Sequence, residues 1–587
     1  MANSNLDLVK ALDKIRFGNL YVHNDELPGA SFTTSQIQSR KVYLVESLAV
    51  INALVDRGTM LLFGGHGGGK TTLAKYLGQV FYQLTKEEIE DCILRGHPQL
   101  TEEKILGSLD IAQLTRAKEL NSEQKVDVIW NTFVDSPWKI IDELNRLSPY
   151  AQNILLSLLA ESSVKYHNES KRLPNFTLFA TMNPKDEGNF IMSLPFLDRF
   201  SLALPITMPD YESLSTIGKK DKSSKQDDIS TYLKNFDLKS VQDEVRELKY
   251  SDDAEMFINM IISSYRLCER ISKESNENIT VEKGLCDGCH FNAPEKVCNK
   301  IIHPLSVRVK EDLYRYGKAL AWFLGESEVK VKHIKTLAPF IIWHRSSLSK
   351  KYKTELSKKR FEESIFSLNI ELESTKEIVD KIENEFNGLL PYLIKFDKVK
   401  KGKLNQIEFG EFINDIKQPD KNFLITKKEI VPILEKEYSS VYSEIIKYNT
   451  DIERENNLDE LNSLKIELSK RYDIPNRQFL ADLIEKKRKT IGAESLSERI
   501  FKIPFDKFIE NVKIECSELY KLVKLRFSVD FNPVSRITIL LSDIGESDYN
   551  LEMERLNEGS GKYSLRFVYR GPENNFVYKF LRDKNVS

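Results

Sequence analysis

The stretch that decides the fold is residues 60–72, which read MLLFGGHGGGKTT. Its first four residues are apolar and predict a buried strand, and apolar residues recur at helical spacing after Lys70. Between strand and helix lies G-x-x-x-x-G-K-T, the pattern of a phosphate-binding loop. A glycine-rich loop can match this pattern by chance, but the strand before it and the helix after it argue against that. We therefore expect this chain to bind a nucleoside triphosphate.

The residues of this loop have distinct expected roles. Glycines let backbone N–H groups approach a polyphosphate closely, and the N-terminus of the following helix adds its dipole. Lys70 can reach the β- and γ-phosphates, and the hydroxyl of Thr71 can ligate Mg²⁺. The predicted nucleotide-binding set is Gly65, Gly67, Gly68, Gly69, Lys70, Thr71, Thr72 and Asp142.

Length and composition limit the classes of protein to consider. With 587 residues the chain is too long for one hydrophobic core, so two to four domains are expected. No apolar run is long enough to span a membrane, and the first residues lack the pattern of a secretory signal. Six cysteines in so long a chain do not suggest a disulfide scaffold, so a cytoplasmic location is expected.

Polar residues follow two further predicted strands. The strand at 138–141 is followed by Asp142, expected to hold Mg²⁺, and by Glu143, expected to polarise the attacking water. The strand at 176–180 leads to Asn183, which can bond that water or the γ-phosphate, or can be an ordinary turn residue. Arg199 can act on a neighbouring subunit's γ-phosphate, or can be a plain surface residue. Strands that alternate with helices predict a parallel α/β sheet.

Several segments resemble one family. Residues 141–149, IDELNRLSP, resemble the D-E-I-N-R-A-x-P signature of MoxR-family AAA+ ATPases, and FATMNP at 179–184 with LPFLDRF at 194–200 is similar to a second block of that family. LRGHP at 94–98 resembles the segment that carries an insertion in helix 2, and a polar hairpin at 163–173 matches the hairpin before sensor 1. PLSVR at 304–308 and WHR at 343–345 resemble the sensor 2 helix and the end of the lid.

This resemblance covers roughly residues 35–350 and has several implications. It implies a ring-forming, hexameric ATPase with Asn183 as sensor 1, Arg199 as arginine finger and Arg308 as sensor 2. It also implies partner proteins with von Willebrand factor A (VWA) domains. His66 and the three glycines after it depart from the usual loop, so the preferred base stays open between adenine and guanine, with ATP the expected nucleotide.

A cysteine cluster in the lid predicts a metal site. Cys286, Cys289, Cys298 and His303 follow the spacing C-x₂-C-x₈-C-x₄-H, which suits a tetrahedral Zn²⁺. His290 can replace His303, and Cys268 is a more distant fourth ligand. The alternative is a set of unbound, reduced thiols.

The C-terminal half has no such resemblance. Apolar residues at steps of three and four from 361 to 386 and from 434 to 468 predict long helices, with a lysine-rich loop over 398–421. After about residue 520 the period changes to two, which predicts antiparallel strands at 523–529, 537–541, 563–569 and 576–580. The expected domains are an N-terminal helix and connector (1–34), an AAA+ α/β core (35–210), a helical lid (211–350) with its insertion at 286–303, a helical stalk or bundle (351–518) and a β domain (519–587).

Three functions remain after these observations. The leading hypothesis is a MoxR-like ATPase that remodels or matures partner proteins, which by the resemblance are proteins with VWA domains. The second is a motor that acts on nucleic acid or a defence NTPase of the McrB or MCM-like kind, against which a net charge of −2 argues mildly. The third is a nucleotide-gated scaffold without hydrolysis, which the presence of both Glu143 and Arg199 disfavours. No membrane partner is expected.

Overall fold

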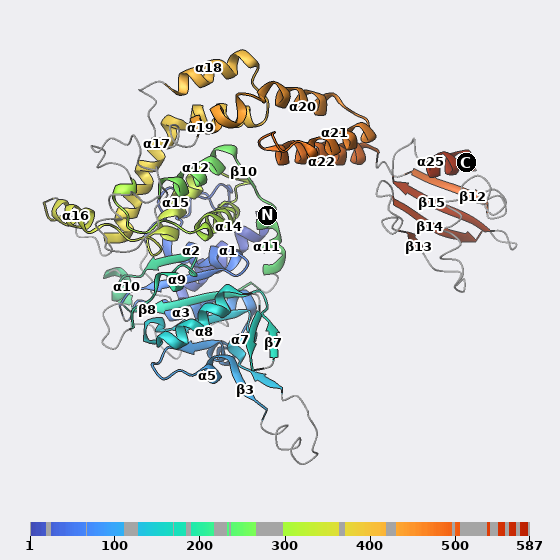
Figure 1. The fold of residues 1–587 in the computed structure, drawn as a ribbon. Helices are drawn as coiled ribbons and strands as arrows, with labels where there is room; N and C mark the ends of the chain where they lie inside the picture. Colours follow the sequence, from blue (N-terminus) through green and yellow to red (C-terminus); the bar gives the residue numbers. More distant parts are fainter. Residues whose placement is uncertain are drawn as a thin grey trace. The chain divides into compact units, whose positions relative to one another are not determined.

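The computed structural model in Figure 1 divides the chain into two compact units, Met1–Leu390 and Pro391–Ser587. We describe each unit by itself. The residues that the structure describes are 2–18, 25–65, 67–110, 127–161, 163–167, 169–183, 190–209, 211–216, 232–233, 236–265, 297–362, 370–417, 430–495, 499–504, 537–539, 550–557, 563–570 and 576–584.

The first unit is built on a five-stranded parallel sheet with the strand order β2-β5-β8-β1-β9. Every strand is short and mostly apolar, as expected for a parallel sheet that is covered on both faces. This sheet confirms the α/β fold class expected from the sequence. Its strands are β1 (Thr59–Phe63), β2 (Ile93–Arg95), β5 (Trp138–Asp142), β8 (Thr177–Met182) and β9 (Leu202–Pro205).

Three helices of the α/β part begin in different ways, and one of them has a side-chain cap. Helix α8 (Pro149–Ala160) has Pro149 in its first turn, and the Ser148 hydroxyl accepts a hydrogen bond from the backbone N–H of Ala151. Helix α3 (Lys70–Tyr82) starts directly after the glycine-rich loop and packs on β5 and β8. Helix α2 (Leu44–Leu54) packs on β1 and β9 and is buried over nearly its whole length.

Two small antiparallel hairpins accompany the sheet. One joins β3 (Gly107–Leu109) to β4 (Val128–Trp130), and the other joins β6 (Ser163–Tyr166) to β7 (Glu169–Arg172) where the polar hairpin was expected. The rings of Trp130 and Tyr166 lie edge to face, with centroids 6.4 Å apart, so the two hairpins contact each other. Short helices α4 (Lys86–Asp91), α5 (Glu102–Leu106) and α7 (Thr132–Asp135) lie in the same part of the chain.

The helical part of the first unit centres on α14 (Val307–Leu324) and α15 (Val331–Ile342), which pack on each other. The N-terminal helix α1 (Ala2–Gly18) is attached to the end of α14, because the Asn5 amide donates to the carbonyls of Trp322 (3.0 Å) and Phe323 (2.6 Å). The apolar side chains on the same helix are buried, among them Leu8, Leu12 and Ile15. Other helices are α9 (Leu194–Leu197), α10 (Tyr211–Thr216), α11 (Leu238–Glu247), α12 (Asp252–Ser264) and α16 (Lys350–Glu362).

The second unit contains a helical cluster with its own apolar core. Helix α17 (Ile370–Lys400) ends in this unit, and its last turns contribute Val399 to a core that also includes Phe409, Tyr442 and Ile484. A lysine-rich loop was expected over 398–421, yet α18 (Gln406–Ile416) forms there, because Asn405 and Glu408 make a capping box. Further helices are α19 (Val431–Ile433), α20 (Tyr442–Arg454), α21 (Leu458–Lys470) and α22 (Arg477–Ser495). Among the helices described in either unit, none has the length and apolarity needed to cross a bilayer.

The C-terminal part of the second unit contains a four-stranded antiparallel sheet with the order β12-β15-β14-β13. The strand expected at 576–580 is wrong, because α25 (Phe576–Lys584) is a helix there. Its Tyr578 ring contacts Phe501 and Tyr569 on the sheet. Packing against the sheet therefore favours a helix here over the strand that the alternating residues predict. The strand expected at 523–529 lies outside the described residues. The other strands are β12 (Arg499–Pro504), β13 (Ile537–Ile539), β14 (Asn550–Asn557) and β15 (Tyr563–Arg570).

Candidate active site

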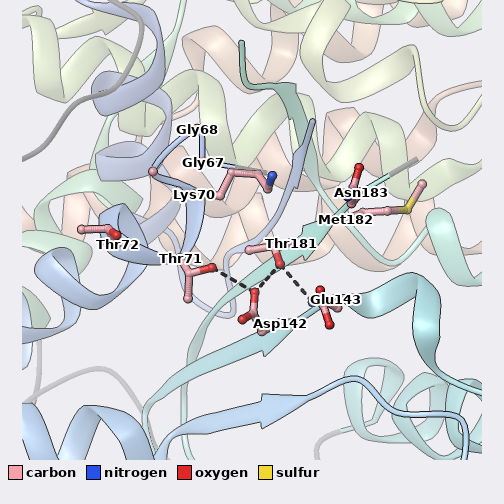
Figure 2. Close-up of a pocket in the computed structure, with 11 residues that line it drawn as sticks. Gly67, Gly68, Lys70, Thr71, Thr72, Asp142, Glu143, Thr181, Met182 and Asn183 are labelled. Atoms are coloured by element: carbon pink, nitrogen blue, oxygen red, sulfur yellow. Dashed lines mark hydrogen bonds between the residues drawn. The ribbon is translucent and has the colours of Figure 1, made fainter. Parts of the chain in front are cut away.

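A cavity of about 250 Å³ opens at the carboxyl ends of β1, β5 and β8 (Figure 2). In an open parallel sheet this edge is where ligands bind, because the loops that leave the strands converge there. The cavity brings together all the predicted nucleotide-binding residues except Gly65, and it adds two residues from the end of β8. Its lining is Gly67, Gly68, Gly69, Lys70, Thr71, Thr72, Asp142, Glu143, Thr181, Met182 and Asn183.

The glycine-rich loop depends on backbone conformations that favour glycine. Gly67 (φ 80°) and Gly69 (φ 74°) lie in the left-handed region, and Gly69 caps the start of α3. The Lys70 ammonium donates to the carbonyls of Gly64 (2.7 Å) and Gly65 (2.6 Å), which keeps it curled over the loop. Burial lowers the pKa of Lys70, and Asp142 opposes that shift. His66 lies outside the described residues.

Asp142 is the centre of a small hydrogen-bond cluster beneath the loop. Its Oδ1 accepts from the hydroxyl of Thr71 (2.9 Å) and from the hydroxyl of Thr181 (2.6 Å), as Figure 2 shows. Hydroxyl and carboxylate oxygens are the ligands that Mg²⁺ prefers, so the donor set of Thr71 and Asp142 fits that cation. Lys70, at the first turn of α3, fits the phosphates of the nucleotide.

Glu143 follows Asp142 in an unusual backbone conformation. Its φ of 56° and ψ of 52° are left-handed, which is costly for a residue other than glycine and recurs at functional sites. The Glu143 N–H donates to the Thr181 hydroxyl (3.0 Å), and its carboxylate pairs with Arg146 (3.3 Å). A Cβ on Gly96 would stand 2.1 Å from the carbonyl oxygen of Glu143, so only glycine fits beside this turn.

Asn183 lies at the end of β8 and lines the cavity beside Met182. Its main chain is fixed from both sides by the buried amide of Asn145. The Asn145 Nδ2 donates to the Asn183 carbonyl (2.7 Å), and the Asn183 N–H donates back to the Asn145 Oδ1 (3.4 Å). Asn145 belongs to the signature at 141–149. It therefore holds Asn183, the residue predicted as sensor 1, at the edge of the cavity.

Arg199 and Arg308 do not line this cavity. Both line a second, larger cavity of about 780 Å³, which also includes Arg57 and Thr59 at the amino end of β1. Arg308 pairs with Asp198 (3.0 Å). Because β1 has five residues that rise about 3.3 Å each, Thr59 lies about 13 Å along the strand from Phe63, where the glycine-rich loop begins. The two cavities therefore lie at opposite edges of one sheet.

The second cavity is rich in positive charge. Burial lowers the pKa of Arg199, and the nearby Arg308 lowers it further. Burial also lowers the pKa of Arg57, with Arg315 as a second cause. Mutual repulsion of this kind is relieved when an anion enters, so the cavity suits a phosphate group. Its charged lining residues are Arg57, Asp198, Arg199, Arg308, Lys310, Glu311, Asp312, Arg315 and Arg345.

The predicted zinc ligands are only partly within the described residues. Cys298 lies in a short 3₁₀ turn and His303 follows it, before α14. Cys286, Cys289, His290 and Cys268 lie outside the described residues. Within those that the structure describes, no group of three or more His, Cys, Asp or Glu side chains could hold a metal ion.

Fold and cavity together define a class of protein. A parallel sheet with a glycine-rich loop and Lys-Thr after β1, and an Asp-Glu pair after β5, is a P-loop nucleotide-binding domain.

Comparison with known proteins then narrows the class to a family. Residues 59–200 match the AAA domain of the dynein-related subfamily, and the resemblance to MoxR-family AAA+ ATPases is confirmed by relatives of that kind. The chain is 27% identical over 221 residues to the protein YeaC of Bacillus subtilis, and 27% identical over 162 residues to the protein MoxR of Methylorubrum extorquens.

These similarities cover only part of each protein. They span 36% and 27% of this chain, and 63% and 43% of YeaC and MoxR, so the chain matches less than two thirds of either relative. A solved structure of a candidate ATPase from Cytophaga hutchinsonii is similar over 62% of this chain and 94% of its own, with 19% identity and a TM-score of 0.42.

Sequence reasoning missed several residues of these two cavities. Thr181 is the most important, because its hydroxyl joins Asp142 to the backbone of Glu143. A polar residue at the end of an otherwise apolar strand was the signal that could have found it. Arg57 and Arg315 reach the second cavity from a loop and from a helix, and no local pattern marks them.

Proposed function

We propose that this chain is a MoxR-like AAA+ ATPase that hydrolyses ATP in an oligomeric ring and thereby remodels or matures partner proteins. The observation that carries the proposal is the cluster of Thr71, Asp142 and Thr181 beneath the glycine-rich loop, with Glu143 beside it. Thr71, Asp142 and Glu143 would each have a defined part in phosphoryl transfer to water, and Thr181 bonds both Asp142 and the Glu143 N–H.

The chemistry assigns a role to each side chain. The backbone amides of the loop and Lys70 bind the phosphates, while Thr71 and Asp142 would hold Mg²⁺, which neutralises charge on the β- and γ-phosphates. Glu143 accepts a proton from the water whose oxygen bonds to the γ-phosphorus. The bond from that phosphorus to the β–γ bridging oxygen breaks, so that ADP and inorganic phosphate leave. Asn183 orients the water or the γ-phosphate.

The separation of the two cavities supports the proposed ring. Arg199 lies at the edge of the sheet opposite its own glycine-rich loop, so it is placed to serve a nucleotide held by a neighbouring subunit. Arg308 lies in the same cavity and pairs with Asp198, next to Arg199 in the chain. We propose that both arginines act across a subunit interface, in a ring that is a hexamer by the family resemblance.

The partner is proposed to be a protein with a VWA domain. Support comes from the resemblance to MoxR-type proteins. The residues that line the two cavities bear on the nucleotide and not on the partner protein. Capture of a VWA-domain protein from a native lysate by the intact chain supports this partner. ATPase activity that rises on addition of DNA, with no such protein captured, contradicts it and favours the motor.

The central experiment is Glu143→Gln. The variant keeps the shape of the side chain but cannot accept a proton, so turnover should fall by at least about 100-fold while ATP binding is retained. Steady-state phosphate release and binding of a fluorescent ATP analogue measure the two quantities. Glu103→Gln, at an exposed site on α5, is the matched control and should behave as the parent. Near-normal turnover of Glu143→Gln overturns the role of Glu143.

We further propose that Cys286, Cys289, Cys298 and His303 hold a structural Zn²⁺, with His290 as the alternative fourth ligand. The spacing of the four residues supports this site. Elemental analysis of the purified protein should find about one zinc per chain, and Cys286→Ser should lose it. A parent protein without bound zinc rejects the site.

A further inference from the structure

A buried polar network lies at the amino end of β1, beside the second cavity. Thr59 is the first residue of that strand and is 5% exposed. Its hydroxyl donates to the carbonyl of Arg199 (2.9 Å) and accepts from the N–H of Ser201 (2.9 Å). One side chain therefore fixes the main chain on both sides of Phe200.

The same short segment is held from the helical part of the unit. The Arg345 guanidinium donates to the carbonyl of Phe200 (3.0 and 2.7 Å) and to the carboxylate of Asp312 (2.6 Å). Asp312 in turn accepts from the hydroxyl of Ser201 (3.0 Å). Backbone groups from Arg199 to Ser201 are thus attached both to β1 and to the helix α14, which carries Asp312.

Charge stabilises this network. Burial would raise the pKa of Asp312, but Arg345 and Arg315 outweigh that effect and hold the pKa below its usual value. The carboxylate is only 3% exposed, and a buried pair of this kind is costly to break from one side. Asp312 is therefore a permanent anchor for the segment that follows Arg199.

The Arg199 side chain has a buried Nε with no hydrogen-bond partner among the residues that the structure describes. Asp198 attracts the guanidinium and Arg308 repels it. Contacts to the main chain that carries this side chain therefore add to what holds it in position. Thr59 bonds directly to that main chain through the carbonyl of Arg199, and the Arg199 N–H donates to the carbonyl of Phe196 (3.1 Å) within the same segment.

We propose that Thr59 is a positioning residue for Arg199. Through Thr59, strand β1 links Arg199, which would act on a neighbouring subunit, to the glycine-rich loop of its own subunit. The inference rests on the proposed function, because it requires Arg199 to act on a neighbouring subunit's nucleotide. The link is physical: β1 begins at Thr59 and passes after Phe63 directly into the loop at Gly64. A buried strand is stiff, so a shift of the loop on nucleotide exchange reaches Arg199 through one hydrogen bond.

The test is Thr59→Val, which keeps the side-chain shape and removes the hydroxyl. The matched control is Thr177→Val, because Thr177 begins the neighbouring strand β8, is 1% exposed and makes no bond to Arg199. We expect kcat for ATP to fall by about 10- to 100-fold in Thr59→Val, since a small misplacement of a catalytic group has effects of that size. The affinity for a fluorescent ATP analogue should match that of Thr177→Val. The melting temperature of Thr59→Val should be somewhat lower, because the Arg199 carbonyl and the Ser201 N–H lose their buried partner.

A mixing experiment separates positioning from general damage. Thr59→Val subunits keep a complete nucleotide site, and Glu143→Gln subunits keep a well-placed Arg199. In a mixed ring, a Glu143→Gln subunit can therefore present its Arg199 to the nucleotide of a Thr59→Val neighbour. Turnover per Thr59→Val subunit should then rise. Equal activity of Thr59→Val and Thr177→Val overturns the inference, and so does a low activity that mixing does not restore. Arg199→Ala serves as the reference: if it retains full activity, the proposed function fails, whereas a defect there with a normal Thr59→Val rejects only the role of Thr59.

Discussion

The two ends of β1 make opposite chemical environments from the same sheet. At the carboxyl end, glycine amides, Lys70, three threonine hydroxyls and the carboxylates of Asp142 and Glu143 surround a cavity of about 250 Å³. At the amino end, five arginines and a lysine outnumber Asp198, Glu311 and Asp312 in a cavity of about 780 Å³ that has no glycine-rich loop in its lining. The first end has the groups that bind a nucleotide and its Mg²⁺, and the second presents an excess of positive charge.

This difference teaches how one chain can carry two halves of a site that it does not complete alone. Charge that develops on a γ-phosphate in the transition state needs a cation beside it, and arginine supplies that cation in many phosphoryl-transfer enzymes. In the ring that we propose, the cation at the far end of the sheet would serve a nucleotide held by a neighbouring subunit.

The largest effect is expected from Arg199→Ala at the amino end. Loss of an arginine that stabilises the transferring phosphoryl group lowers kcat by about 1,000-fold or more. Nucleotide affinity should change little, because the binding cavity lies at the other edge. Steady-state ATPase assays and binding of a fluorescent analogue check both values, with Arg454→Ala on α20 as an exposed control. If Arg199→Ala weakens binding and turnover together, the two ends are not separate.

A smaller effect is expected from Thr181→Val at the carboxyl end. The substitution removes the hydroxyl that bonds Asp142 and the Glu143 N–H, so the left-handed turn at Glu143 loses a support. Two lost hydrogen bonds of this kind are worth about 1–3 kcal/mol, which corresponds to a turnover reduced by roughly 10- to 100-fold. Thr177→Val, at the amino end of the same strand, is the control. Mixing with Glu143→Gln subunits should not restore Thr181→Val, in contrast to Thr59→Val, and a restored activity would contradict its place in the subunit's own site.

The smallest effect concerns Lys139, the second residue of β5. Its ammonium is fully buried and donates to the carbonyls of Val134 (2.9 Å) and Ser136 (2.7 Å). Burial lowers the pKa of Lys139 to about 7 from 10.5. Between pH 7 and pH 10.5 the unfolded chain binds one more proton at this residue than the folded chain. The contribution of Lys139 to the free energy of unfolding therefore rises with pH in this range and is flat below pH 7.

Lys139→Met should therefore lose this pH dependence. The parent should gain about 1 kcal/mol of unfolding free energy per pH unit between pH 7 and 9 from this residue alone, and the variant should not. Denaturant unfolding at pH 7, 8 and 9 measures the difference in slope between the two proteins. Parallel slopes would show that Lys139 does not titrate in this range.

The sequence was sufficient where a local pattern carries the chemistry. The glycine-rich loop, Lys70, Thr71 and the Asp142-Glu143 pair each follow an apolar strand, and the carboxyl ends of parallel strands share one edge of a sheet. For that reason their convergence could be predicted without coordinates. The fold class followed from the same alternation of strands and helices.

Residues whose role depends on strand neighbours could not be predicted in this way. Thr181 reaches Asp142 because β5 and β8 are adjacent and in a particular register, which no single segment specifies. Thr59, Ser201 and Asp312 are up to 253 residues apart in the chain (312 − 59 = 253) and meet only in the folded unit. At 576–580 alternating residues suggested a strand, but the helix α25 can bury Tyr578 and Leu581 against the sheet instead.

The N-terminal helix has a practical consequence for protein production. A fragment that begins at residue 35, where the α/β core is expected to start, would lack the Asn5 amide that caps the end of α14 and the buried Leu8, Leu12 and Ile15. The surface they cover would then be apolar and exposed, a condition that promotes aggregation. Expression of the catalytic unit should therefore retain residues 2–18, and an affinity tag at that end should be separated from Asn5 by a flexible spacer.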